Sequence, residues 1–484
     1  MTERPQSEGR GDVAWEQLRS VHMVAIAGVG MTALAGLLKA RGVAVRGSDE
    51  QIYPPMSDVL AELGIEVRTG HRAENLEPRP DLVIVGNKVS RGNPEVEALL
   101  LSDIPYLSMA SALGRYFLSD KRSLVVAGTH GKSTSTAMLA AVLRSAGRDP
   151  GMMVGGNALD FGGNFASGAG EHFVIEGDEY DTAFFDKRPK FLHYRPAAAI
   201  LTAVEFDHAD IYADLAAVLD AFRQFLALLP RDAPLVVNSH FPHATNLAAE
   251  AAQCRVETFG SDGVAWSYDQ LRDTGERTVF RVAHAGRPEG DVALRAPGVI
   301  NVWNALGVYA LARIEGLSHA EVAVGLESFQ GVARRQELVG VYGGVVVIDD
   351  FAHHPTAVEG VLSALRQRYP DRRLWALFEP RSNTSRRAVF QRDYARALAL
   401  ADQIILAQVF RKESDVVVAD QELSTERLVA DLGGASRRAR VARDAAAITD
   451  LVVREAAAGD VVVMMSNGAF GGLRGLLREG LSRR

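Results

Sequence analysis

The sequence contains very little cysteine and no long apolar run. Cys254 is the only cysteine among 484 residues, so no disulfide can form within the chain, and we expect a reducing, cytoplasmic location. No apolar stretch approaches the roughly 18 residues that span a bilayer. The polar N-terminus, MTERPQSEGRGD, lacks the apolar core of a signal peptide. These absences predict a protein that does not insert into a membrane.

A strong excess of charge of either sign is also missing. The chain carries 53 Lys and Arg residues against 60 Asp and Glu residues, which gives a net charge of -7. It contains no block of basic residues, and this argues against general nucleic-acid binding. With 47% hydrophobic residues the chain can bury large cores, and its length suggests about three domains of ordinary size.

The most informative stretch covers residues 123–136, SLVVAGTHGKSTST. Its β-branched start predicts a buried parallel strand, its glycines a turn, and its Ala/Leu-rich continuation a helix. Backbone N–H groups at such a helix start bind phosphate together with Lys132, and the hydroxyl of Ser133 suits Mg²⁺. The loop is a shortened P-loop, because Val126 stands where the ordinary pattern has its first glycine. The alternative is an ordinary strand-to-helix turn with Lys132 in solvent.

A second glycine turn lies near the N-terminus. Residues 21–27 predict a strand, and Gly28 and Gly30 precede a helix, as in a dinucleotide-binding βαβ unit. Asp49 ends the next strand, where its carboxylate could bind a ribose or uridine hydroxyl. Ala33 replaces the third glycine of the pattern, so nucleotide binding and an ordinary βαβ unit stay equally open.

Acidic and histidine side chains follow two other predicted strands. The strand at residues 173–175 leads into Glu176, and the strand at residues 197–203 leads towards His208. Because parallel strands end at one edge of a sheet, these side chains can converge on Lys132. A carboxylate and an imidazole beside a hydroxyl form the sparse ligand set that suits a magnesium–nucleotide complex.

The segments around Glu176 are less informative. Asp178, Glu179 and Asp181 could surround a metal site, cap a helix or face solvent, and a structural role is favoured for each of them. The glycine-rich residues 151–170 predict an irregular loop that faces a substrate.

Several polar residues in the second half of the chain each allow two interpretations. Asn301 and Asn304 share a helical face and could contact adenine or satisfy interior polar groups. Arg335 could clamp a phosphate at a domain junction or lie in a charged linker. Asp350 could bind a ribose hydroxyl or cap the next helix. Arg381 could bind a carboxylate through two N–H groups or lie on the surface.

The order of the motifs resembles the Mur ligase superfamily, whose members join an amino acid or peptide to the carboxylate of a UDP-sugar. The motifs are GTHGKST, EGDEYD, VEFDHAD, NVWNAL, GVARRQE, DDFAHHPT and EPRSNTS. Four further motifs resemble the uridine-binding part of the family: GVGMTALAG, GSD, GHRAENL and GNKVSRGNPEVEA. One branch attaches the tripeptide L-Ala-γ-D-Glu-meso-diaminopimelate to UDP-N-acetylmuramate in peptidoglycan recycling. Three segments of this chain resemble that branch: EGDEYDTAFFDKRPKFLHYRP, EPRSNTS and MSNGAFGG.

The resemblance implies an α/β protein of three domains that uses ATP and Mg²⁺. After a polar extension (residues 1–20), we expect an N-terminal Rossmann-like domain that binds the UDP-sugar (21–119). A central P-loop domain with a parallel sheet would bind ATP (120–332). A C-terminal Rossmann-like α/β domain would bind the peptide (333–484). The substrates would thus be small molecules, UDP-N-acetylmuramate and the murein tripeptide.

The resemblance also implies roles for individual residues. The catalytic residues would be Lys132, Glu176 and His208. ATP would contact Gly128, Thr129, His130, Gly131, Lys132, Ser133, Thr134, Asn301, Asn304, Arg335 and Asp350. Mg²⁺ would be held by Ser133, Glu176 and His208. The UDP-sugar would contact Gly28, Gly30, Asp49, His71 and Asn87. The peptide would contact Arg381, Ser382, Asn383, Thr384, Ser466 and Asn467.

Three positions depart from the family pattern. Ile300 replaces a usual His and Phe351 a usual Tyr, and both changes concern the adenine and ribose pocket. Met31 replaces a usual Gly in the turn expected to face the pyrophosphate.

Three other functions compete with this interpretation. A ligase that attaches free L-alanine shares most of the motifs, but its counterpart of EPRSNTS reads differently. An NAD-dependent dehydrogenase would use Gly28 and Gly30 but would leave the phosphate loop unexplained. A nucleotide-gated binding protein would bind ATP without catalysis.

Overall fold

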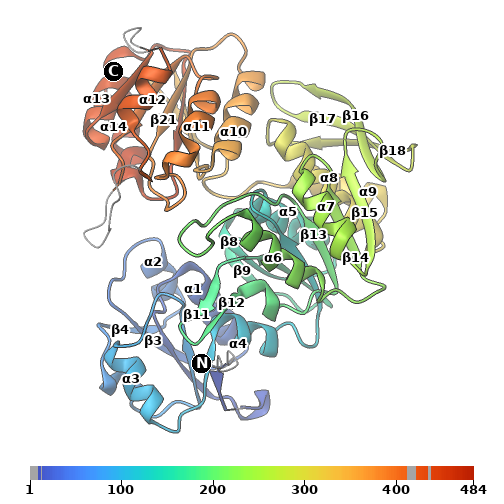
Figure 1. The fold of residues 1–484 in the computed structure, drawn as a ribbon, viewed down its shortest axis with the longest axis vertical. Helices are drawn as coiled ribbons and strands as arrows, with labels where there is room; N and C mark the ends of the chain where they lie inside the picture. The colour runs from blue at the N-terminus through green and yellow to red at the C-terminus, as the bar shows by residue number, and fades with distance from the viewer. Residues whose placement is uncertain (1–8, 12, 411–420, 434–437) are drawn as a thin grey trace.

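The computed structural model describes residues 9–11, 13–410, 421–433 and 438–484. Three α/β domains follow one another along the chain, each built on its own large sheet, which confirms the predicted fold class (Figure 1). Within the described ranges, every helix is too short or too polar to cross a bilayer.

The first domain has a six-stranded sheet in the order β1-β6-β5-β2-β3-β4, parallel except for β1. Its strands are β1 (Gly9–Arg10), β2 (Ser20–Val24), β3 (Ala44–Asp49), β4 (Glu66–Thr69), β5 (Leu82–Val85) and β6 (Tyr106–Ser108). Its helices are α1 (Val29–Ala40), α2 (Met56–Glu62), α3 (Pro94–Leu101) and α4 (Met109–Tyr116). The strand order reverses between β2 and β5, and ligands bind at the carboxyl ends of strands at such a point.

The chain before Ser20 takes part in this first domain. β1 pairs with β6, and the side chains of Val13 and Leu18 are buried in the domain core. The hydroxyl of Tyr116 donates a hydrogen bond of 2.9 Å to the carbonyl oxygen of Val13. Of the polar extension expected over residues 1–20, residues 1–8 and 12 lie outside the described ranges, and residues 13–18 pack onto the domain.

The central domain has a ten-stranded sheet in the order β18-β17-β16-β15-β14-β13-β7-β10-β8-β9. Its strands are β7 (Arg122–Ala127), β8 (Gly151–Ala158), β9 (Gly163–Ser167), β10 (His172–Gly177), β13 (Ala198–Leu201), β14 (Pro234–Asn238), β15 (Arg255–Gly260), β16 (Trp266–Asp273), β17 (Thr278–His284) and β18 (Arg287–Leu294). A separate ribbon consists of β11 (Asp181–Ala183) and β12 (Asp186–Pro189). The helices are α5 (Lys132–Ser145), α6 (Leu215–Leu226), α7 (Pro242–Ala251), α8 (Val299–Ile314) and α9 (His319–Ser328). β7 lies between the parallel strands β10 and β13, so the phosphate loop is flanked by both polar strand ends.

The glycine-rich residues 151–170 form the hairpin β8–β9, so the expected irregular loop was wrong. Glycine disfavours strands because it adds no side chain to pack, and this hid the hairpin from the sequence pattern. The ring of Phe165 in β9 fills the space where a Cβ at Gly36 of α1 would lie. The hairpin therefore packs the central domain against the first domain.

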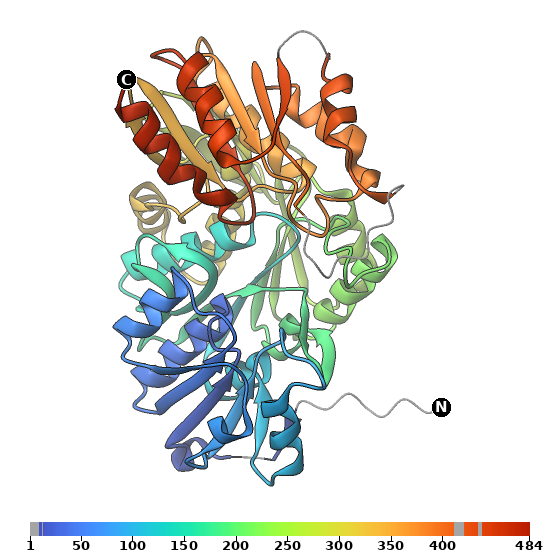
Figure 2. The ribbon, with the colours of Figure 1, turned by 90° about the vertical axis from the view of Figure 1, so that its left-hand side faces the viewer.

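The C-terminal domain has a six-stranded sheet in the order β19-β20-β24-β21-β22-β23, with an apolar core on each face. Its strands are β19 (Glu337–Tyr342), β20 (Val345–Asp350), β21 (Leu374–Phe378), β22 (Gln403–Ala407), β23 (Ala439–Ala442) and β24 (Val461–Met465). Its helices are α10 (Pro355–Arg368), α11 (Gln391–Leu398), α12 (Thr425–Asp431), α13 (Ala445–Glu455) and α14 (Leu473–Ser482), and α13 and α14 cover one face (Figure 2). Short 3-10 helices are η1 (Trp15–Gln17), η2 (Ala73–Leu76), η3 (Lys190–His193), η4 (Ala388–Phe390) and η7 (Phe470–Gly472).

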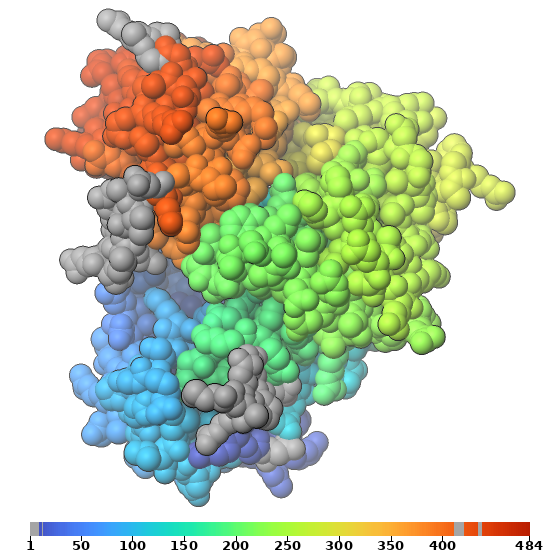
Figure 3. Space-filling view, viewed as in Figure 1, coloured from blue at the N-terminus to red at the C-terminus, as the bar shows by residue number. Residues whose placement is uncertain are grey.

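The C-terminal domain touches the central domain in the space-filling view (Figure 3). The buried hydroxyl of Thr384 donates to the carboxylate of Asp207. Arg368 of α10 forms an ion pair of 2.9 Å with Asp273 of β16. The two domains are therefore joined both near the nucleotide side, after β21, and at the C-terminal end of α10.

Candidate functional site

The phosphate loop lies between β7 and α5, as the sequence predicts. Gly131 precedes α5 with a φ of 80°, a left-handed conformation that favours glycine. A Cβ there would collide with the amide oxygen of Asn304. Gly128 has a φ of 136°, and a Cβ there would collide with the Thr202 hydroxyl and the Ala203 backbone. Both positions therefore require glycine, because a side chain would collide with the neighbouring residues.

Lys132 does not project freely into the loop but forms a buried ion pair. Its Nζ lies 2.8 Å and 3.0 Å from the two carboxylate oxygens of Glu179. Burial alone would lower the pKa of Lys132, but the charges of Glu179 and Asp178 outweigh burial and raise that pKa. Lys132 therefore carries its full positive charge at neutral pH.

His208 completes the same charge network. Its Nε2 lies 3.0 Å from a carboxylate oxygen of Glu179. Burial alone would raise the pKa of Glu179, but Lys132 and His208 together lower it. His208 also adopts a φ of 53°, and such strain in a non-glycine residue accumulates at functional sites. The network thus holds Lys132 and His208 against one ionised carboxylate, and both contact its Oε1.

Ser133 and Glu176 form a second polar pair beside Lys132. The Ser133 hydroxyl donates to a carboxylate oxygen of Glu176 at 3.0 Å, and the other oxygen accepts from the Gly155 N–H at 2.7 Å. The guanidinium of Arg335 lies 3.4 Å from the Ser133 hydroxyl oxygen. A hydroxyl and a carboxylate oxygen at this separation, with a charged arginine nearby, can hold a hydrated cation and phosphate oxygens.

The predicted ATP-contacting residues surround one cavity of about 400 Å³ between the central and C-terminal domains. Gly128 lies beneath the loop and does not line this cavity. The lining includes Thr129, His130, Gly131, Lys132, Ser133, Thr134, Asn301, Asn304, Arg335 and Asp350, together with Glu176 and His208. Residues more than 200 positions apart in the sequence thus meet at one site.

In the segment that joins the two domains, Arg335 lies between two residues with strained backbone conformations. Arg334 and Gln336 have φ angles of 59° and 49°, and left-handed conformations in such residues cost free energy that the surroundings must supply. The guanidinium of Arg335 lies 4.8 Å from the centre of the Phe351 ring. Phe351 therefore supplies an aromatic platform without the hydroxyl of the usual tyrosine.

Asp350 closes the cavity from the C-terminal domain. Its two carboxylate oxygens accept from the N–H groups of Gln336 at 2.7 Å and Ala352 at 2.6 Å. Burial raises the pKa of Asp350 to about 6, against the opposing charge of Arg335. The carboxylate fixes the turn after β20 and lies within reach of a ligand hydroxyl.

The two asparagines of α8 and the substituted Ile300 share one end of the cavity. Asn301 donates to the carbonyl oxygen of Pro297 at 2.9 Å, and Asn304 donates to the amide oxygen of Asn301 at 3.4 Å. Ile300 lies against Gly360 of α10, where a Cβ would approach its Cδ1. The isoleucine therefore lines the cavity and packs the central domain on the C-terminal domain.

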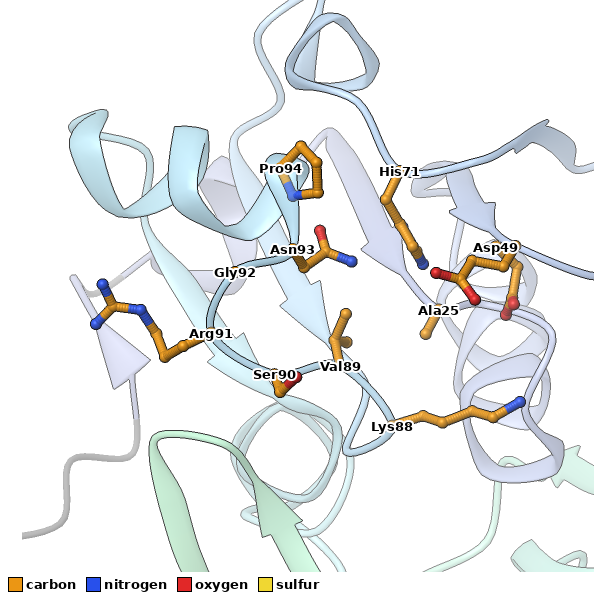
Figure 4. A pocket seen from close by; sticks show the side chains of 11 residues that line it. Ala25, Asp49, His71, Lys88, Val89, Ser90, Arg91, Gly92, Asn93 and Pro94 are labelled. Carbon is orange, nitrogen blue, oxygen red and sulfur yellow. The ribbon is translucent and has the colours of Figure 1, made fainter. Parts of the chain in front are cut away.

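The residues expected to contact the UDP-sugar divide between two cavities. Asp49 and His71 line a cavity of about 460 Å³ in the first domain, and Figure 4 shows these two side chains pointing toward one another. Gly28, Gly30 and Asn87 line a second cavity, of about 240 Å³. The loop between β2 and α1 separates the two groups.

A buried carboxylate fixes the orientation of His71. Glu95 of α3 is completely buried and accepts hydrogen bonds from Ser48 at 2.7 Å, from His22 at 2.5 Å and from Asn75 at 3.0 Å. Burial would raise the pKa of Glu95, but the hydrogen bonds from His22 and Ser48 lower it. An ionised carboxylate only accepts hydrogen bonds, so the 3.0 Å contact with Nδ1 of His71 makes that nitrogen the donor. Nε2 is then the ring nitrogen of His71 that Glu95 does not engage.

The second cavity connects the first domain with the phosphate loop. Gly28 and Gly30 lie on one side, and Glu176 and Asp178 lie on the other. The same two acids also line the nucleotide cavity. A ligand that extends from the first domain can therefore place one end beside Lys132 and Ser133.

The expected peptide-contacting residues lie outside these three cavities. Arg381 stacks at 3.8 Å on the Phe410 ring, and Ser466 donates to Glu379. Ser382 and Asn383 bond within their own loop, and Thr384 is engaged by Asp207. Among the described residues, the buried amide oxygen of Asn467 has no hydrogen-bond partner.

Sequence reasoning missed the central role of Glu179. A structural role was favoured for each of the acids after Glu176, yet Glu179 contacts both Lys132 and His208. The available signal was the spacing in EGDE. Glu179 lies three residues after Glu176, where the chain turns at the end of β10. The imidazole of His354 was missed as well, although it lines the nucleotide cavity.

Family models match most of the chain. The Mur ligase family catalytic domain matches residues 20–120, the Mur ligase middle domain matches residues 126–312, and the Mur ligase glutamate ligase domain matches residues 334–468. The UDP-N-acetylmuramate--L-alanyl-gamma-D-glutamyl-meso-2,6-diaminoheptandioate ligase of Escherichia coli strain K12 is 39% identical, over 96% of this chain and 98% of its own. The UDP-N-acetylmuramate--L-alanine ligase of Arthrobacter sp. strain FB24 is 38% identical, over 92% and 91%. A crystal structure of a murein peptide ligase from Psychrobacter arcticus 273-4 has a TM-score of 0.70 at 32% identity, over 96% of this chain and 99% of its own.

Proposed function

The chain belongs to the Mur ligase family, and we propose that it joins the tripeptide L-Ala-γ-D-Glu-meso-diaminopimelate to UDP-N-acetylmuramate with conversion of ATP to ADP and phosphate. The observation that carries this proposal is the shared lining of the two cavities by Glu176 and Asp178. A UDP-sugar in the second cavity can then bring its carboxylate to the phosphate of a nucleotide in the neighbouring cavity. The three-domain fold and full-length similarity to a tripeptide ligase support the same reaction.

The reaction has two covalent steps. The lactyl carboxylate of the UDP-sugar attacks the γ-phosphorus of ATP, the bond to ADP breaks, and an acyl phosphate forms. The free α-amine of the tripeptide then attacks the acyl carbon and loses a proton as phosphate leaves. Two anions meet in the first step, so positive charge must already be in place when the transition state forms.

Lys132 and Arg335 both line the cavity and would supply this charge. Lys132 lies at the start of α5, where the backbone N–H groups also favour a phosphate. Arg335 approaches the Ser133 hydroxyl from the domain junction. Asn301, Asn304 and Asp350 line the same cavity and would contact the nucleoside portion.

Mg²⁺ fits the polar pair beside Lys132. Ser133 and Glu176 offer two oxygen atoms 3.0 Å apart, and Mg²⁺ commonly takes few protein ligands with water and phosphate. His208, the third residue expected to hold the ion, contacts Glu179 in this structure. When bound, the ion would neutralise charge on the phosphate oxygens. ATP and a UDP-sugar as substrates, and the single cysteine, support a cytoplasmic location.

The choice of amine tests the proposal directly. Assayed with UDP-N-acetylmuramate and ATP, the protein should show a kcat/KM for the tripeptide at least about 100-fold above that for L-alanine. A site built for the carboxylates of the longer peptide leaves polar groups unpaired when they are missing. Faster turnover with L-alanine would assign the chain to the alanine-adding reaction instead, the alternative that the Arthrobacter relative represents.

Replacing Glu95 with glutamine tests the UDP-sugar side. Because Glu95 fixes the donor nitrogen of His71, the KM for UDP-N-acetylmuramate should rise about tenfold, which corresponds to about 1.4 kcal/mol, with little change in kcat. The matched control is Glu97→Gln, since Glu97 lies on the same helix and pairs with Arg91 at the surface. An unchanged KM for UDP-N-acetylmuramate in a folded Glu95→Gln protein would show that His71 does not contact this substrate.

A further inference from the structure

Two histidines and a carboxylate meet where the central and C-terminal domains face each other. His130 belongs to the phosphate loop, Glu205 follows β13, and His354 precedes α10 of the C-terminal domain. One ligand atom of each of the three residues lies within 4.8 Å of the other two. The two imidazole rings lie with their centres 4.5 Å apart at an angle of 41°.

The present contacts of this cluster are incomplete. Nε2 of His130 and Oε2 of Glu205 lie 2.8 Å apart, yet both buried atoms lack a hydrogen-bond partner of good geometry within the described chain. Among the described residues, the polar contacts of the His354 ring are long, 3.3 Å from its Nε2 to the carbonyl oxygen of Phe206 and 3.4 Å from its Nδ1 to the Thr356 nitrogen. Buried polar atoms normally have partners, so the cluster has capacity for a further ligand.

The donor set selects a particular class of ion. Two imidazoles and one carboxylate with an open position are typical ligands of Zn²⁺ and related transition-metal ions, whereas Mg²⁺ prefers oxygen ligands alone. A tetrahedral ion with bonds of about 2.0 Å holds its ligand atoms about 3.3 Å apart. The widest pair would therefore close by at most about 1.5 Å, a movement that side-chain rotation can supply.

We propose that His130, Glu205 and His354 form a binding site for a transition-metal ion of the Zn²⁺ class, separate from the magnesium site expected at Ser133 and Glu176. The site joins the two domains, because His130 and Glu205 come from one and His354 from the other. His130 and His354 both line the nucleotide cavity, so water or a phosphate oxygen can take the fourth position. An ion bound here holds the domains together and slows any product release that requires them to separate.

The test measures metal binding rather than activity. Untagged full-length protein in excess Mg²⁺ is titrated with Co²⁺, whose visible absorption reports its coordination, and the bound ion is then displaced with Zn²⁺. We expect one Co²⁺ per chain. His354→Gln and Glu205→Gln should each weaken binding at least about tenfold, because even the loss of an outer partner costs a metal site that much.

Glu176→Gln is the matched control, since it removes a carboxylate from the neighbouring magnesium site. It should leave the Co²⁺ affinity within about twofold. Loss of binding in Glu176→Gln with retention in Glu205→Gln would move the ion to the phosphate loop and overturn the proposal. Loss in Glu205→Gln with retention in His354→Gln would overturn the bridge between domains, and an absence of binding in the unchanged protein would overturn the site. Glu205 is partly exposed, so its replacement keeps the test valid if His354→Gln fails to fold.

Discussion

Replacing Lys132 with alanine is expected to lower the rate of ADP formation by about a thousandfold. Lys132 carries the positive charge beside the helix start at which the nucleotide phosphates would lie, and removal of one such preorganised group costs about 10²–10³ in kcat. Measurement of substrate-dependent phosphate release checks the prediction. Unchanged release in the variant would contradict the assignment of the phosphate loop.

The ion pair of Lys132 with Glu179 requires a further control. Without Lys132, the Glu179 carboxylate, which is 2% exposed, keeps His208 as its one ion-pair partner among the residues that the structure describes, and breaking a buried pair costs about 3–5 kcal/mol of stability. The double variant Lys132→Ala/Glu179→Gln removes the uncompensated charge and should recover stability without recovering activity. Lys187→Ala is the matched surface control, because Lys187 pairs with Asp181 in an exposed setting.

Replacing Arg381 with alanine is expected to lower kcat/KM for the tripeptide by about 100-fold and to change the slow reaction with L-alanine little. The guanidinium stacks on the Phe410 ring and lies 3.6 Å from Glu379. About a third of the side chain stays exposed, which leaves N–H groups free to bind a peptide carboxylate. Loss of such a charged contact costs about 2–5 kcal/mol.

Two variants separate peptide binding by Arg381 from a structural role. Arg381→Lys keeps the charge but not the paired N–H donors, so it should give an intermediate loss. Arg396→Ala removes an exposed arginine of the same domain and should behave as the unchanged protein. An equal loss with tripeptide and L-alanine in Arg381→Ala would show that the residue does not contact the peptide.

Much of the fold and the nucleotide cavity could be predicted from strand ends. In a parallel sheet, the residues that follow neighbouring strands meet at one edge, and this placed Lys132, Glu176 and His208 around one site. The strand pattern also put Asp350 at the end of its strand but left ribose binding and helix capping open. Its place at the nucleotide cavity was implied by the resemblance to the Mur ligase superfamily.

The contacts between side chains could not be predicted in the same way. Glu179 lies on an irregular turn between β10 and β11, where neither a period of 2 nor one of 3.6 indicates the direction of a side chain. The hairpin β8–β9 escaped detection because glycine lowers strand propensity and because its partners, β10 and the Gly36 face of α1, are distant in the sequence. His354 reaches the central domain only through the docking of α10, which no local pattern encodes.

The buried hydrogen bond between Thr384 and Asp207 joins the loop expected to bind the peptide to the nucleotide cavity. Thr384 ends the loop that we assign to the peptide, and Asp207 precedes His208 at the nucleotide site. A ligand that shifts either residue changes the free energy of the other. Thermodynamic linkage makes this effect reciprocal, so the factor by which bound nucleotide alters peptide affinity equals the factor by which bound peptide alters nucleotide affinity. A single hydroxyl group can thereby couple the affinities of two substrates that bind to different domains.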